Sequence, residues 1–87
     1  FNPPQELLEA ASRALTEGWN QYVPTWGLPE LREAIANKTE RFYGFRPNPR
    51  TQVTVTCGVT EAVISALVGL VDKGDKVVIL EPAHENY

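Results

Sequence analysis

The chain has 87 residues, of which 43% are hydrophobic and 22% are charged, a composition typical of globular proteins and not of disordered tails. Its formal net charge of -3 gives no basic surface and argues against a nucleic-acid partner. A single cysteine excludes an internal disulfide framework and a multi-cysteine zinc site, and it is typical of a reducing, cytoplasmic environment.

Residues 2–18 have the pattern of an amphipathic helix. Asn2 is expected to cap it, with Pro3 at its first position and Gln5 as the capping-box partner. Gly18 is the expected stop. Apolar residues recur at helical spacing and charged residues lie on the other side: Leu7, Leu8, Ala11, Ala14 and Leu15 against Glu6, Glu9, Arg13 and Glu17. One face of this helix must therefore be buried.

The connection that follows, 19–27, is rich in aromatic residues. It carries Trp19, Tyr22 and Trp26, which form an exposed hydrophobic patch prone to association unless another part of the protein or another subunit covers them. A second helix is predicted from Pro29 to Gly44, and the prolines of 47–49 prevent it from continuing.

After residue 49 the period of the apolar residues changes. Residues 52–57 alternate polar and apolar side chains, as a half-buried strand does. Residues 60–71 read as a helix that is apolar nearly all round, too short to span a membrane and in need of cover on both sides. Residues 77–80 are apolar on both faces, as in an interior parallel strand. The order predicts an α/β fold with a right-handed strand–helix–strand unit.

The turn between the first predicted strand and its helix is a candidate anion site. Backbone N–H groups in the first turn of a helix, together with the helix dipole, attract anions such as phosphate. Gly58 allows a sharp turn there, and the Thr60 hydroxyl adds a donor. Many such turns bind nothing, so a plain connection is the alternative. Neither a dinucleotide nor a nucleoside triphosphate motif is present.

Two potentially reactive side chains, Cys57 and His84, fall at or beyond the C-terminal ends of the predicted strands, where open α/β sheets bind ligands. A Cys–His nucleophile pair is one interpretation. No orienting third group or oxyanion motif accompanies the pair. The alternative is that Cys57 is a small buried hydrophobe and His84 a surface loop residue.

Four blocks of sequence carry a family resemblance. They are Asn20-Gln21-Tyr22, Gly-Leu-Pro-Glu-Leu-Arg-Glu-Ala-Ile at 27–35, Val-Thr-Val-Thr-Cys-Gly-Val-Thr-Glu-Ala at 53–62, and Gly-Asp-Lys-Val-Val-Ile-Leu-Glu-Pro at 74–82. Together they resemble the class I and II aminotransferases, pyridoxal 5'-phosphate (PLP) enzymes of fold type I, and most of all the kynurenine/aspartate aminotransferase-like branch. The likeness covers essentially the whole chain.

The resemblance implies a place in the fold. The chain would be part of a three-layer α/β/α large domain, with 1–48 as an N-terminal helical segment and interface loop. Residues 49–87 would be the first, incomplete strand–helix–strand part of the PLP-binding domain. In this family the first two strands are not neighbours in the sheet, so 52–57 and 77–80 are expected to be separated by later strands. Because the sequence holds no methionine, we expect it to be a piece of a longer protein.

The resemblance also implies the cofactor-binding residues. The backbone at Gly58, Val59 and Thr60 would hold the PLP phosphate. Tyr22 would reach across a homodimer interface to the phosphate in the partner subunit, although it could instead pin the loop to its own core. His84 matches the position of a ring stacked on the PLP pyridine, where a histidine departs from the commonest pattern. The alternative for His84 is again a loop residue.

The implied activity is the transfer of an amino group from an amino acid to a 2-oxo acid. The family's Schiff-base lysine matches none of Lys38, Lys73 and Lys76, so no catalytic residue is assigned and the chain alone is expected to be inactive. The alternatives are a PLP-dependent lyase, decarboxylase or synthase of the same fold, a non-catalytic aminotransferase-like domain of a transcriptional regulator, and a free-standing α/β interaction domain. No metal, nucleic-acid or membrane partner is expected.

Overall fold

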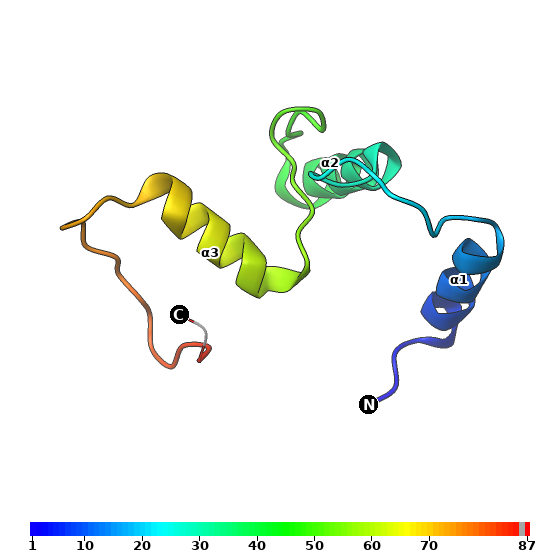
Figure 1. Ribbon diagram of the computed structural model, residues 1–87, viewed down its shortest axis with the longest axis horizontal. Helices are drawn as coiled ribbons and strands as arrows, with labels where there is room; N and C mark the ends of the chain where they lie inside the picture. The colour runs from blue at the N-terminus through cyan, green and yellow to red at the C-terminus, as the bar shows by residue number, and fades with distance from the viewer. Residues whose placement is uncertain (86) are drawn as a thin grey trace.

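A computed structural model describes residues 1–85 and residue 87, and over these residues it contains three helices (Figure 1). Helix α1 spans Gln5–Thr16, α2 spans Pro29–Tyr43 and α3 spans Gly58–Leu70. Figure 1 shows α1 and α3 on opposite sides of α2. No helix packs against another within the described part of the chain. Long irregular segments join the three helices.

Helix α1 begins later than the sequence analysis predicted. Its N-cap is Pro4, with φ -53° and ψ 142°, and Gln5 is the first helical residue. The Gln5 side chain donates a hydrogen bond to Glu9 at 3.1 Å. The roles predicted for Asn2, Pro3 and Gln5 in the cap are therefore wrong. Pro3 precedes another proline, and a residue in that position is driven out of the helical conformation.

The predicted ends of the first two helices are confirmed. After α1, the N–H of Gly18 donates to the Leu15 carbonyl at 3.4 Å, and the N–H of Trp19 donates to the Ala14 carbonyl at 2.9 Å. This pair of bonds is the Schellman arrangement that closes a helix C-terminus. Helix α2 ends at Gly44, which has a left-handed conformation with φ 74°.

The two predicted strands do not form in this chain. Over the described residues, 52–57 and 77–80 are irregular segments without strand pairing, so the strand–helix–strand prediction is wrong for the isolated chain. The helix predicted between them is present as α3. A strand requires a hydrogen-bonded neighbour. If the two strands are not adjacent in the sheet, as expected above, neither has its partner within these 87 residues.

The molecule is open. Its radius of gyration is 16.4 Å, whereas a compact domain of this length has about 12 Å. Its accessible surface is 8068 Å², against about 5,100 Å² for a compact protein of this mass. Large apolar side chains of α3 are exposed: Val59, Ile64, Leu67, Val68 and Leu70. Helix α3 thus lacks the cover that its composition requires, and the free-standing interaction domain loses its support.

A small buried cluster lies where the loop before α2, α2 itself and segment 52–57 meet. Ala36 is fully buried, and Val53 and Arg32 are exposed to 9% and 5%. Gly27 is buried with them. This cluster joins α2 to the loop before it and to segment 52–57. Within the described residues, no helix has the length and apolar character needed to cross a membrane.

Candidate functional site

The N-terminal end of α3 is the best-defined polar site. Gly58 is the first helical residue and has φ +84°. Its N–H donates to the Thr56 carbonyl, and the Thr56 hydroxyl donates to the Gly58 carbonyl, both at 2.9 Å. These two bonds form a tight turn that carries the chain from segment 52–57 into the helix. The sharp turn predicted at Gly58 is confirmed.

The first turn of α3 presents donors suited to a phosphate group. Amides in the first turn of a helix point out of its N-terminal end. Here they belong to Val59, whose side chain is 62% exposed, and to Thr60. A Cβ added to Gly58 would meet no atom within 4 Å in the described chain, so there is room in front of the turn. The residues present therefore fit the phosphate of PLP.

The amide N–H of the residue before Gly58 already donates to a carboxylate. Glu61, in the first turn of α3, accepts a hydrogen bond from the N–H of Cys57, the N-cap residue. This contact stabilises the helix start, because a negative charge is favourable at this end of the helix dipole. The Cys57 amide is therefore not among the candidate donors to an anion at this helix start. The Cys57 thiol is exposed, so the prediction of a buried hydrophobe is wrong for this chain.

Tyr22 lies on the loop between α1 and α2 and is fully exposed, with a relative accessibility of 104%. The ring therefore does not pack into a core formed by the described residues. The preceding residues hold the loop: the Asn20 side chain donates to the Leu15 carbonyl at 3.0 Å, and Gln21 donates to the Asn20 side chain at 2.8 Å. The loop thus bonds to the end of α1 and leaves the tyrosine in the solvent.

His84 lies on an exposed turn near the C-terminal end of the chain. Its carbonyl accepts the N–H of Tyr87 at 3.1 Å, and the two rings are tilted by 57° with their centroids 6.1 Å apart. Tyr22, the Gly58 turn and His84 therefore occupy three separate segments of the chain. Within the described residues, no group of three His, Cys, Asp or Glu side chains is arranged to hold a metal ion.

Sequence reasoning missed Arg32. Its side chain is almost fully buried, and its Nε donates to the Val53 carbonyl at 3.0 Å. The signal was present in the helical period: Arg32 lies four residues before the buried Ala36 and therefore shares its face of α2. An arginine on a buried face requires hydrogen-bond partners. Because arginines usually lie in solvent, composition alone gave no reason to select it.

Comparison with known proteins connects these features. The family described as "Aminotransferase class I and II" matches residues 1–87. The chain is 44% identical to the methionine aminotransferase of Escherichia coli and 41% identical to a probable aspartate aminotransferase of Methanocaldococcus jannaschii. It is 39% identical to the aspartate/prephenate aminotransferase of Thermus thermophilus. Each match covers all of this chain but only 22% or 23% of the relative's length.

A solved structure has the same open shape. The crystal structure of YbdL from Escherichia coli, described with a methionine aminotransferase function, matches with a TM-score of 0.93 and 44% sequence identity. The match covers 100% of this chain and 23% of that one. The arrangement in Figure 1 is therefore the one that a corresponding segment adopts inside a larger folded aminotransferase.

Proposed function

Because this chain belongs to the aminotransferase class I and II family, we propose that the whole protein uses PLP to transfer an amino group from an amino acid to a 2-oxo acid. The relatives named above are all aminotransferases, and the sequence match runs over every residue of the chain. The fold agreement with YbdL supports the same proposal. The lyase, decarboxylase, synthase and regulator alternatives receive no comparable support.

The single observation that carries the cofactor assignment is the tight turn at Gly58 that leads into the first turn of α3 within the family-matched sequence. We propose that the backbone at Gly58 and the amides of Val59 and Thr60 bind the PLP phosphate. Helix α3 supports this role because its first turn follows a tight turn and its dipole favours an anion there. These groups bind and orient the cofactor and take no part in proton transfer.

Two further residues complete the proposed contacts. The Tyr22 hydroxyl would donate a hydrogen bond to the PLP phosphate in the partner subunit of a homodimer. The full exposure of Tyr22 on a tethered loop permits this contact. His84 would stack on the pyridine ring, a role that a flat imidazole can fill. The whole protein would then require two subunits for each complete cofactor site.

When bound, PLP would act as the electron sink for the carbanion left by the loss of an α-proton from an amino acid. The residues of this chain would hold PLP by its phosphate group and by one face of its pyridine ring. Precise orientation is worth a large share of an enzyme's rate enhancement. Their contribution is therefore binding and alignment, and the lysine that reacts with the cofactor must come from elsewhere in the whole protein.

We also propose a division of the chain, with residues 1–48 as the helical segment and interface loop and 49–87 as the incomplete start of the PLP-binding domain. An apolar cleft of about 370 Å³ lies between α3 and segment 77–80, and this unfilled apolar space supports the proposal that the second part is incomplete. Val63 and Leu67 line it from the helix. Because free thiols persist in reducing compartments, the exposed Cys57 thiol supports a cytoplasmic location for the whole protein.

The test uses the whole protein. Purified protein would be titrated with PLP, and its absorption spectrum followed until the cofactor band saturates. It would then be offered a panel of amino acids with a common 2-oxo acid, and both products of the transfer would be quantified. Stoichiometric PLP binding with paired formation of a new amino acid and a new 2-oxo acid is expected. Binding of PLP with release of ammonia or carbon dioxide instead would contradict the aminotransferase assignment.

A further inference from the structure

The buried arginine of α2 makes a contact that the proposed function does not use. The Arg32 Nε donates to the carbonyl oxygen of Val53, on the segment that leads to α3. Burying a charged group is costly unless it is hydrogen-bonded. A leucine or methionine at this place would fill the same volume without that cost. The bond to Val53 therefore offsets the cost of burying this charge.

A second contact holds the same segment two residues further on. The N–H of Val55 donates to the Trp26 carbonyl at 3.0 Å. The next residue of that loop, Gly27, lies against the Val55 side chain. Segment 52–57 is thus held at alternate residues, by α2 through Arg32 and by the preceding loop through Trp26. We call these two backbone contacts the latch.

The latch lies between two parts of the proposed cofactor site. On one side, the loop fastened by Trp26 also carries Tyr22. On the other, segment 52–57 runs directly into the tight turn at Thr56 and Gly58, where α3 begins. Since no helix packs on another within residues 1–85 and 87, α3 gains no direct support from α2. The latch therefore fixes the start of α3 relative to the Tyr22 loop.

We propose that Arg32 is a positioning residue for the cofactor phosphate. Its bond to Val53 holds the segment that aims the Val59 and Thr60 amides, and a small displacement of those donors weakens their bonds to a phosphate. This inference rests on the proposed function, because it assigns a role toward the same phosphate. Arg32 itself contacts neither cofactor nor substrate. It acts on the phosphate site through segment 52–57, which leads into the turn at Gly58.

The test compares PLP with pyridoxal, which lacks the phosphate. In the whole protein, Arg32→Met is expected to raise the dissociation constant of PLP about tenfold or more, because the displaced amides of α3 lose the equivalent of one hydrogen bond to the charged phosphate. The dissociation constant of pyridoxal should stay within about twofold, since that ligand makes no phosphate bond. Arg32→Lys is expected to restore part of the PLP affinity, because its ammonium group can donate to the Val53 carbonyl.

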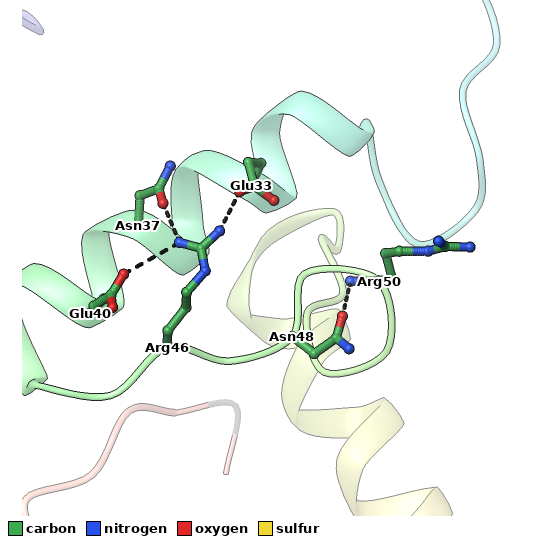
Figure 2. Close-up of polar contacts among 6 residues, drawn as sticks. All are labelled: Glu33, Asn37, Glu40, Arg46, Asn48 and Arg50. Atoms are coloured by element: carbon green, nitrogen blue, oxygen red, sulfur yellow. Dashed lines mark hydrogen bonds and ion pairs between the residues drawn. The ribbon is translucent and has the colours of Figure 1, made fainter.

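The chain offers a matched control in Arg46. Figure 2 shows its guanidinium among Glu33, Asn37 and Glu40, all on α2, and its bond to Glu40 is 3.5 Å long. Within the described residues, these side-chain bonds of Arg46 reach α2 and not segment 52–57. Arg46 lies on the segment after α2, so Arg46→Met removes an arginine that bonds to α2 without touching the latch. It is expected to lower stability and to leave the ratio of the two dissociation constants unchanged.

Two results would overturn the inference: an unchanged ratio of the two dissociation constants in Arg32→Met, including an equal loss of both ligands, or the same change of that ratio in Arg46→Met. Where Arg32→Met does not yield folded protein, Arg32→Gln takes its place, and an unchanged ratio there has the same meaning. Failure of the unaltered protein to bind PLP is a different result, because it rejects the proposed function itself. The two failures are therefore distinguishable.

Discussion

Gly27 lies so close to Val55 that a Cβ built on the glycine would come within 2.7 Å of both the Cβ and the Cγ2 of the valine. The same glycine has φ +107°, a conformation that other residues rarely adopt. We therefore predict that Gly27→Ala destabilises the whole protein by about 2–6 kcal/mol, the sum of backbone strain and overpacking. Chemical denaturation of the two proteins, followed by fluorescence, measures the difference.

Gly18 provides the control for this substitution. It also has a positive φ, of 91°, but a Cβ there would meet no atom within 4 Å in the described chain. Gly18→Ala therefore introduces the strain without the collision, and its cost should be the smaller one. Equal losses at Gly18 and Gly27 would show that the contact with Val55 contributes nothing.

If the first turn of α3 binds the PLP phosphate, removing one backbone N–H there should weaken the binding of PLP and not that of pyridoxal. Val59→Pro deletes the amide N–H in the first turn of α3, where proline is tolerated because that N–H has no carbonyl within the helix to bond. The dissociation constant of PLP should rise about tenfold or more, with pyridoxal little affected. Val59→Ala keeps the amide and should bind PLP normally. Loss of PLP affinity in the alanine variant would point to the side chain instead.

Tyr22 is predicted to act on the other subunit. Tyr22→Phe removes one hydroxyl and should weaken PLP binding about tenfold, as the loss of a hydrogen bond to a charged group does. A mixed dimer then distinguishes the two directions of contact. One subunit carries Tyr22→Phe and its partner carries Val59→Pro, so a contact across the interface leaves one of the two sites intact. Titration with PLP should show one site of unaltered affinity for every two subunits.

If Tyr22 instead contacts the phosphate bound by its own subunit, each of the two sites in the mixed dimer carries one of the two substitutions. In that case both sites would bind PLP weakly, and no tight phase would appear in the titration. Mixed dimers can be separated by different affinity tags on the two subunits. The experiment therefore reads the geometry of the interface without requiring activity.

Stacking by His84 is predicted to depend on a flat ring and not on its nitrogen atoms. His84→Phe keeps a ring and should retain the affinity for PLP. His84→Ala removes the ring and should raise the dissociation constant about two- to tenfold, the usual worth of one stacked pair. PLP titration of both variants provides the measurement. Identical affinities in the alanine and phenylalanine variants would mean that His84 is a loop residue.

The helix ends could be predicted from local sequence, and the strands could not. Gly18 and Gly44 end their helices as expected because a C-terminal cap involves only residues a few positions apart. The start of α1 was missed although its cause is equally local, since Pro3 stands before Pro4. Segments 52–57 and 77–80 have the right alternation, but pairing depends on chain that lies far away in sequence.

The candidate site divides in the same way. The sharp turn at Gly58 followed from the change of period and from glycine itself. The exposure of Tyr22 and of the Cys57 thiol did not, because exposure depends on what the rest of the fold covers. The helical period could have placed Arg32 on the buried face of α2, but not its partner: the carbonyl acceptor on Val53 is 21 residues further along the chain. Only a structure brings such a pair together.

The open shape leads to a last prediction, that residues 1–87 expressed alone will not unfold cooperatively. Their 8068 Å² of accessible surface exceeds that of a compact protein of this mass by more than half, and within the described residues no helices pack together. Since packing of apolar faces supplies most of a helix's stability, thermal melts followed by circular dichroism should show a broad, gradual loss of helix. The whole protein should melt in a sharp transition. A sharp transition from the isolated chain would mean that α1, α2 and α3 find a packed arrangement of their own, different from the one in Figure 1.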